Sequence, residues 1–156
     1  MKLSRRNILA GMAVLPMASA LPATAQSGTA IYVYKGRGCG CCTAWVDILK
    51  EKGFAPTTET LHPAELVQLK LSKGVPQKLS ACHTAVIDGY LVEGHVPVAD
   101  IRRLISEKPD ALGIAVPEMP YGSPGMGPES EREAYDVILF KPDGATEIFS
   151  HYEAAS

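Results

Sequence analysis

Three of the four cysteines in this chain lie within four consecutive residues, Cys39-Gly40-Cys41-Cys42. They follow the short apolar run 31–34 and precede a helical pattern that begins near Thr43, so they occupy a predicted strand-to-helix turn. Disulfides that stabilise a small fold are usually spread along the chain, and adjacent cysteines can bridge only with strain. The spacing therefore predicts a reactive or metal-binding site and argues against a structural disulfide framework.

Two chemistries fit this cysteine cluster. The N-terminus of a helix stabilises a thiolate, which serves both thiol–disulfide exchange and metal capture. Exchange needs only Cys39 and Cys42, and the extra thiol of Cys41 would risk mixed disulfides. A soft metal such as Cu(I) gains from the extra sulfur, and zinc is the alternative ion. The cluster favours metal binding, while a thiol–disulfide oxidoreductase that uses Cys39 and Cys42, or a closed structural zinc site, stays open.

Further sulfur and imidazole donors lie in three other segments of the chain. Cys82 and His83 are adjacent at the entry to a predicted strand, and His95 lies at the turn after the same predicted hairpin. Met119 and Met126 lie in a segment rich in glycine and proline. Imidazole and thioether groups are common copper ligands. The alternatives are a buried inert thiol for Cys82, a structural role for either histidine and loop packing for the methionines.

The elements that must position these residues alternate between strand and helix patterns, with no internal repeat. The predicted elements are strands 31–35 and 54–60, helices 43–52 and 63–74, a hairpin of strands 84–87 and 90–92, helix 97–107, and a last hairpin of strands 135–140 and 145–152. Residues 108–134 are expected to form a functional or disordered loop. This order predicts an α/β fold, a thioredoxin-like β-α-β-α-β-β-α domain with an added C-terminal β-hairpin.

A thioredoxin-like layout would place Cys82 against the cysteine turn. Thioredoxins have a cis-proline near that position, in a loop that packs over the reactive pair. This chain has no proline there, since Pro76 lies six residues upstream. A thiol and an imidazole in place of a substrate-docking proline favour ligand binding over thiol exchange.

The N-terminal segment has the features of an export signal. A basic start with the pair Arg5-Arg6 precedes the apolar stretch 8–21, and small-x-small sites lie at its end, 18–20, and just after it, 23–25. The paired arginines are similar to a twin-arginine signal. We therefore expect a signal peptide at 1–25, a single thioredoxin-like metal-binding domain at 26–156 and a periplasmic protein of the Gram-negative type. No later segment has the roughly 20 apolar residues of a membrane span, so no span is expected in the mature chain.

Composition and missing motifs exclude several classes of protein. The formal net charge is −2 at pH 7 and becomes more negative without the basic leader, which disfavours nucleic acid and anionic membrane surfaces as partners. The sequence shows no glycine-rich phosphate loop, no recognisable Ser-His-Asp set and no paired carboxylates near the cysteines. Hydrolase and nucleotide chemistry therefore have no support.

The combination of motifs resembles one known family. The motifs are Cys39-Gly40-Cys41-Cys42, Cys82-His83-Thr84, Glu93-Gly94-His95-Val96-Pro97 and residues 119–126, and the similarity spans about residues 30–152. The chain is similar to the periplasmic CopG-type copper-resistance family, small exported proteins found with metal-resistance systems. The resemblance implies a thioredoxin-like domain that binds copper and has a candidate redox role. The metal ligands that it implies are Cys39, Cys41, Cys42, Cys82, His83, His95, Met119 and Met126.

The sequence thus leads to one hypothesis and one alternative. The hypothesis is a periplasmic copper-binding protein that holds Cu(I) and contributes to copper resistance by sequestration, transfer or copper redox conversion, with other periplasmic copper-handling proteins as candidate partners. The alternative is a thiol–disulfide oxidoreductase. Both a protein that only binds metal and one that turns over a substrate are compatible with these motifs.

Overall fold

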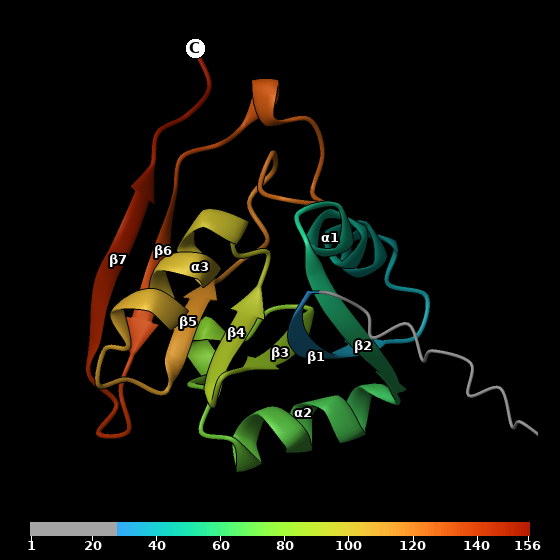
Figure 1. Ribbon diagram of the computed structural model, residues 1–156, viewed down its shortest axis with the longest axis vertical. Coiled ribbons are helices and arrows are strands. Elements are labelled where there is room, and N and C mark those ends of the chain that lie inside the picture. The colour runs from blue at the N-terminus through green and yellow to red at the C-terminus, as the bar shows by residue number, and fades with distance from the viewer. Residues whose placement is uncertain (1–27) are drawn as a thin grey trace, which may run out of the picture.

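The computed structural model describes residues 28–156 and contains one seven-stranded sheet with three α-helices (Figure 1). The expected signal peptide, residues 1–25, lies outside the described residues. Among the residues described, no helix is both long and apolar enough to span a membrane. The predicted mixed α/β class is confirmed.

The helices and strands follow the predicted order closely. In chain order they are β1 (Thr29–Gly36), α1 (Gly40–Glu51), β2 (Phe54–Leu61), α2 (Pro63–Ser72), η1 (Gln77–Leu79), β3 (His83–Ile87), β4 (Tyr90–Gly94), α3 (Val98–Glu107), β5 (Gly113–Val116), η2 (Glu129–Glu131), β6 (Tyr135–Phe140) and β7 (Thr146–Tyr152). Helix α1 begins three residues before the predicted start because Cys39 serves as its N-cap, and cysteine is not among the usual capping residues. The segment Cys41-Cys42 is therefore part of the first helical turn.

The strands are arranged in the order β2-β1-β3-β4-β5-β6-β7. The pairs β1–β2 and β4–β5 are parallel, and the other neighbouring pairs are antiparallel. Strand β2, which contains Pro56, lies at the edge of the sheet, where a proline is tolerated because it need not donate a hydrogen bond to a neighbouring strand. Asp88 and Gly89 both have positive φ, which is the turn geometry expected of a two-residue hairpin between β3 and β4.

The sequence-based prediction was wrong for part of residues 108–134, which were expected to be irregular. Residues 113–116 form β5, which lies between β4 and β6 and is buried along its whole length. Gly113 is essential to this packing because a Cβ at that position would overlap the Leu91 carbonyl group. A four-residue apolar strand is too short to show a periodic pattern. The C-terminal hairpin therefore joins the sheet through β5.

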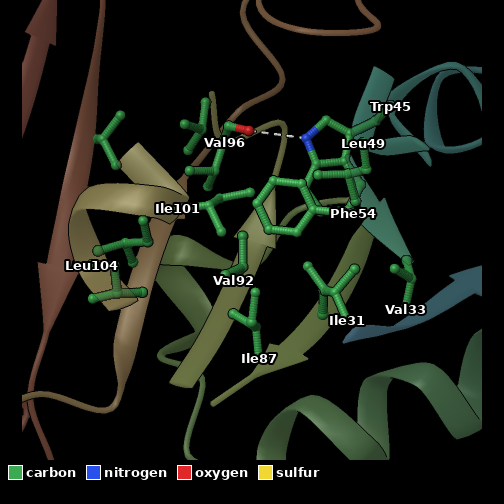
Figure 2. Packing of buried hydrophobic residues seen from close by; sticks show 14 of the residues in the cluster. Ile31, Val33, Trp45, Leu49, Phe54, Ile87, Val92, Val96, Ile101 and Leu104 are labelled. Atoms are coloured by element: carbon green, nitrogen blue, oxygen red, sulfur yellow. Dashed lines mark hydrogen bonds between the residues drawn. The ribbon is translucent and has the colours of Figure 1, made fainter. Parts of the chain in front are cut away.

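Helices α1 and α3 cover one face of the sheet. Trp45 and Leu49 of α1 pack with Ile101 and Leu104 of α3 and with apolar residues of β1, β3 and β4 (Figure 2). The Trp45 side chain is fully buried, and its indole N–H donates a hydrogen bond to the Val96 carbonyl at 2.9 Å. This bond joins α1 to the segment between β4 and α3.

Helix α2 lies against the opposite face of the sheet. Successive residues of β3 show the two faces, because side chains alternate along a strand. The His83 ring lies 4.4 Å from the Trp45 ring on the α1 face, whereas the Thr84 hydroxyl accepts a hydrogen bond from Lys70 of α2. The His83 ring and the buried Lys70 therefore lie on opposite faces of the sheet.

Candidate metal centre

The cysteine turn places three sulfur atoms at the N-terminus of α1. Cys39 has an extended backbone as the N-cap, and its Sγ accepts a hydrogen bond from the Cys42 backbone N–H at 3.3 Å. Cys39 and Cys42 form a disulfide, with their Cα atoms 5.3 Å apart, whereas Cys41 and Cys82 are free thiols. The helix start therefore carries the Cys39–Cys42 disulfide and, beside it, the half-buried free thiol of Cys41.

Cys82 lies against this turn, as the sequence analysis expected. The Cys41 Sγ lies 3.5 Å from the Cys39 Sγ and 3.9 Å from the Cys82 Sγ. The sulfur atoms of Cys39, Cys41, Cys42 and Cys82 all lie within 4.8 Å of one another. We call these four residues the sulfur group.

The same Cys82 also belongs to a second set of donors, with His83 and His95, which we call the imidazole group. The Cys82 Sγ lies 3.0 Å from the His95 Nε2 and 3.4 Å from the His83 Nδ1, and both histidines are fully buried. The donor atoms of this group also lie within 4.8 Å of one another. Cys82 is thus shared by two adjacent groups that could each hold a metal ion.

The hydrogen bonds of His95 identify which of its ring nitrogens is free. The His95 Nδ1 lies 2.8 Å from the Pro124 carbonyl oxygen, which can only accept, so Nδ1 carries the proton and donates. Burial lowers the pKa of His95 from its usual value, which favours the neutral ring. The Nε2 lone pair then points toward the Cys82 sulfur, in the tautomer that a metal ligand requires.

His83 has a buried nitrogen without a partner. Within the described residues, its Nε2 makes no hydrogen bond, although the side chain is fully buried against the rings of Trp45 and His95. Burial lowers the pKa of His83 well below its usual value, which keeps the ring neutral. An unpaired buried polar atom is costly unless a ligand satisfies it. The unpaired nitrogen beside free sulfur atoms fits a metal site.

The free thiol of Cys82 is protonated in the metal-free protein. Burial, reinforced by the nearby Cys41, raises the pKa of Cys82 to about 12. A metal ion binds the thiolate, so binding at Cys82 must displace a proton. Both imidazoles are neutral, the form that a metal ion can bind, whereas the Cys82 thiol would have to lose its proton to become a ligand.

The segment between β5 and β6 packs over the centre. In Figure 1 this segment, in orange, extends from β5 toward α1 before it returns to β6. Gly125 has a left-handed backbone with φ 84°, and a Cβ there would lie 2.9 Å from both the Cys41 carbonyl oxygen and the Trp45 nitrogen. With the Pro124 bond to His95, this contact fixes the segment against α1 and the imidazole group.

The two candidate thioether ligands have different environments. Met126 is half-buried and directly follows Gly125, on the segment that packs against α1. Met119 is 40% exposed and has a left-handed backbone with φ 53°. The structure therefore brings the four cysteines and two histidines together. Of the two methionines, Met126 lies on the segment packed against α1, whereas Met119 is exposed.

Three polar residues beside the site had no assigned role in the sequence analysis. Lys70, Thr84 and Glu93 are buried and hydrogen-bonded to one another on the α2 face of the sheet. Thr84 and Glu93 lie inside the recognised motifs, but an inward-facing lysine on a helix gives no signal until its partner is known.

The fold and the site together define a mixed α/β protein with a sulfur- and imidazole-rich candidate metal centre. Two solved structures, named "Copper resistance protein copG- Form 1" and "Copper resistance protein copG- Form 2", are 41% and 42% identical to the chain with TM-scores of 0.76 and 0.73. The matches cover 81% and 80% of this chain and 99% and 98% of those chains. The chain therefore belongs to the CopG copper-resistance family, which confirms the resemblance noted from the motifs.

A family model and a sequence comparison add to this assignment. The model described as "Protein of unknown function, DUF411" matches residues 79–126, which include Cys82, His83, His95 and both methionines of the segment between β5 and β6. No curated protein sequence matches the chain.

Proposed function

We propose that this chain is a copper-binding protein that holds Cu(I) through the sulfur and imidazole groups and contributes to copper resistance by sequestration, transfer or copper redox conversion. The observation that carries the proposal is the meeting of four cysteines and two buried histidines at one point, with Cys82 shared between them. Copper is the favoured ion because thiolate and imidazole are its preferred ligands and because the related structures are named copper resistance proteins.

The chain's own residues supply the conditions that a soft ion needs. Burial keeps His83 and His95 neutral, and the Pro124 carbonyl fixes the tautomer of His95. Cys41 and Cys82 supply thiols without any change of redox state. Reduction of the Cys39–Cys42 disulfide by two electrons and two protons would add two more thiols. Redox state would therefore set how many sulfur donors the centre offers, and zinc remains the alternative ion for the same donors.

We also propose that the domain is thioredoxin-like. The order β1-α1-β2-α2-β3-β4-α3, the strand order β2-β1-β3-β4 and the cysteine turn between β1 and α1 support this assignment. Strands β5, β6 and β7 then extend the sheet beyond the core of that fold.

A periplasmic location is the third part of the proposal. The basic start, apolar stretch and small-residue sites of residues 1–25 support cleavage of an exported precursor. Other periplasmic copper-handling proteins are the proposed donors and acceptors of the ion. N-terminal sequencing of protein secreted to the periplasm would test the cleavage site, and an intact residue 1–25 segment there would contradict it.

The experiment that tests copper binding is an anaerobic titration of the fully reduced protein with Cu(I) against a competing chelator. We expect tight binding in the wild type and weaker binding in Cys41→Ser and His95→Asn. His151→Asn is the matched control because His151 lies on β7, half exposed, and bonds to Asp136 outside the centre. Absence of tight binding in the wild type, or equal binding in Cys41→Ser, would contradict the proposal, and metal analysis of protein from the periplasm separates copper from zinc.

A second function has one specific observation in its favour. The Cys39–Cys42 disulfide lies at the N-terminus of α1, in the position where a thiol–disulfide oxidoreductase exchanges its bond with a substrate. This alternative predicts that Cys42→Ser traps a mixed disulfide at Cys39 with a protein substrate. It also predicts that Cys82→Ser leaves exchange unchanged, whereas copper binding through the shared Cys82 predicts a loss of metal in that variant.

A further inference from the structure

The Glu93 carboxylate holds the backbone on both sides of Cys82-His83. Its Oε1 accepts a hydrogen bond from the Ala81 backbone N–H at 2.7 Å, and its Oε2 accepts one from the Thr84 hydroxyl at 2.6 Å. Ala81 directly precedes Cys82, and Thr84 directly follows His83. One fully buried carboxylate on β4 therefore fixes both ends of the two-residue segment that carries two of the candidate ligands.

Lys70 of α2 balances the charge of this carboxylate. Its ammonium group donates to Glu93 Oε1 and, at 2.8 Å, to the Thr84 hydroxyl oxygen. The side chains of Lys70 and Glu93 are 6% and 0% exposed. Buried charges persist only when they are paired and hydrogen-bonded. The pair thus allows a carboxylate to be buried on the face of the sheet that carries Thr84, next to the segment with Cys82 and His83.

The same part of β4 leads directly to His95. Gly94 follows Glu93 with a left-handed backbone, φ 75°, and a Cβ there would lie 2.7 Å from the Ala81 Cβ and 2.5 Å from the Val116 carbonyl oxygen. The segment before Cys82 therefore packs directly on the end of β4. Glu93 is bonded to Ala81, the residue before Cys82, and lies two residues before His95 in the chain. It therefore connects the backbone of Cys82 to that of His95, whose Sγ and Nε2 atoms are 3.0 Å apart.

We propose that Glu93 is a positioning residue for the metal centre, which holds Cys82 and His83 against His95 through its bonds to Ala81 and Thr84. This inference rests on the proposed metal-binding function. Groups that orient metal ligands from behind typically change metal affinity by about 10- to 100-fold when they are removed. Glu93 holds the residues on either side of Cys82 and His83, so its loss would move Cys82 away from His95 without removing any donor atom.

Two double variants separate positioning from charge. Lys70→Met/Glu93→Gln removes both buried charges and keeps a side-chain oxygen that can accept from the Ala81 N–H. Lys70→Met/Glu93→Leu removes the same charges and has no acceptor. The probes are Cu(I) in competition with a chelator and Co(II) as a spectroscopic substitute, both on the reduced full-length domain under anaerobic conditions. Denaturant unfolding of each metal-free variant measures its stability separately.

We expect the glutamine variant to bind Cu(I) nearly as tightly as the wild type and the leucine variant to bind about 10- to 100-fold more weakly. The cobalt–thiolate absorption band should keep its energy in the glutamine variant and shift in the leucine variant, a change that lower global stability alone would not produce. Equal affinity and identical cobalt spectra in the two variants would overturn the inference. Failure of the wild type to bind Cu(I) would instead overturn the proposed function.

A third variant keeps the test decisive if the leucine variant does not fold. Glu93→Asp retains the negative charge beside Lys70 but is one methylene shorter, so it cannot hold Ala81 and Thr84 at the same distances. We expect this variant to show weaker Cu(I) binding and a shifted cobalt spectrum. Wild-type affinity and spectrum in Glu93→Asp would show that the carboxylate does not position the ligands.

Discussion

The sulfur group and the imidazole group share one residue but are built in different ways. Three members of the sulfur group come from four consecutive residues at a partly exposed helix start, and two of them form a disulfide. The imidazole group joins β3 to the turn after β4, and both of its histidines are fully buried. The first group therefore depends on local sequence and redox state, whereas the second depends on how the sheet brings distant residues together.

Cys82→Ser should have the largest effect because it removes the residue that both groups share. We expect Cu(I) affinity to fall by more than about 100-fold, beyond the range seen when only a supporting residue is lost. Competition with a chelator under reducing, anaerobic conditions measures this change. Cys41→Ser removes a ligand from the sulfur group alone and should have a smaller effect. An equal or larger loss in Cys41→Ser would show that the two groups do not share Cys82 as the geometry indicates.

Gly94→Ala should disrupt the close packing of the end of β4 against Ala81, the residue before Cys82. The added Cβ would lie too close to the Val116 carbonyl oxygen and to the Ala81 Cβ. Alanine would also be strained at φ 75°. Gly89→Ala is the control, because Gly89 has φ 85° but no atom within 4 Å of the added Cβ. We expect Gly94→Ala to lower the free energy of unfolding by about 2 kcal/mol more than Gly89→Ala. If the two variants lost the same free energy of unfolding in denaturant, the loop before Cys82 would be able to move away from the added Cβ.

His95→Asn should reveal how much the imidazole group alone contributes to metal binding when the Cys39–Cys42 disulfide is intact. In oxidised protein the imidazole group keeps all three of its donors, since Cys82 is not in the disulfide. We expect oxidised wild type to bind Co(II), and His95→Asn to weaken this binding by at least about tenfold. His151→Asn should bind as the wild type does. Failure of oxidised wild type to bind the ion would show that the imidazole group depends on the thiols of the sulfur group.

The methionine variants should have the smallest effects. Met126→Ala removes a half-buried side chain from the segment that packs on α1, whereas Met119→Ala removes an exposed one. We expect copper to leave the Met126 variant faster by less than about tenfold, and the Met119 variant to change less. Stopped-flow transfer of copper to a chelator measures both rates. Unchanged rates in both variants would assign the two methionines to loop packing.

The sequence predicted the parts of the molecule that depend on local patterns. Helices and hairpins followed from periodicity and turn residues, and the cysteine turn was visible from spacing alone. Strand β5 was missed because its four residues are uniformly apolar and carry no period. The start of α1 was placed too late because a cysteine caps it.

The candidate site was predictable as a set of residue types but not as two groups. Sulfur and imidazole motifs identified Cys82, His83 and His95, yet only the antiparallel pairing of β3 with β4 shows that Cys82 contacts both histidines. The roles of Lys70 and Glu93 could not be inferred from the sequence. They belong to α2 and β4, and their ion pair arises only when the helix packs on the sheet.

The ring contact between Trp45 and His83 gives the protein an internal optical signal. Trp45 is the only tryptophan in the sequence, and its indole N–H is bonded to Val96, the residue after His95. Its fluorescence therefore arises from one buried ring that touches one histidine of the imidazole group and is tethered beside the other. We therefore expect an ion that binds His83 or His95 to change the emission of that ring, so loading of the centre could be followed in the unlabelled protein.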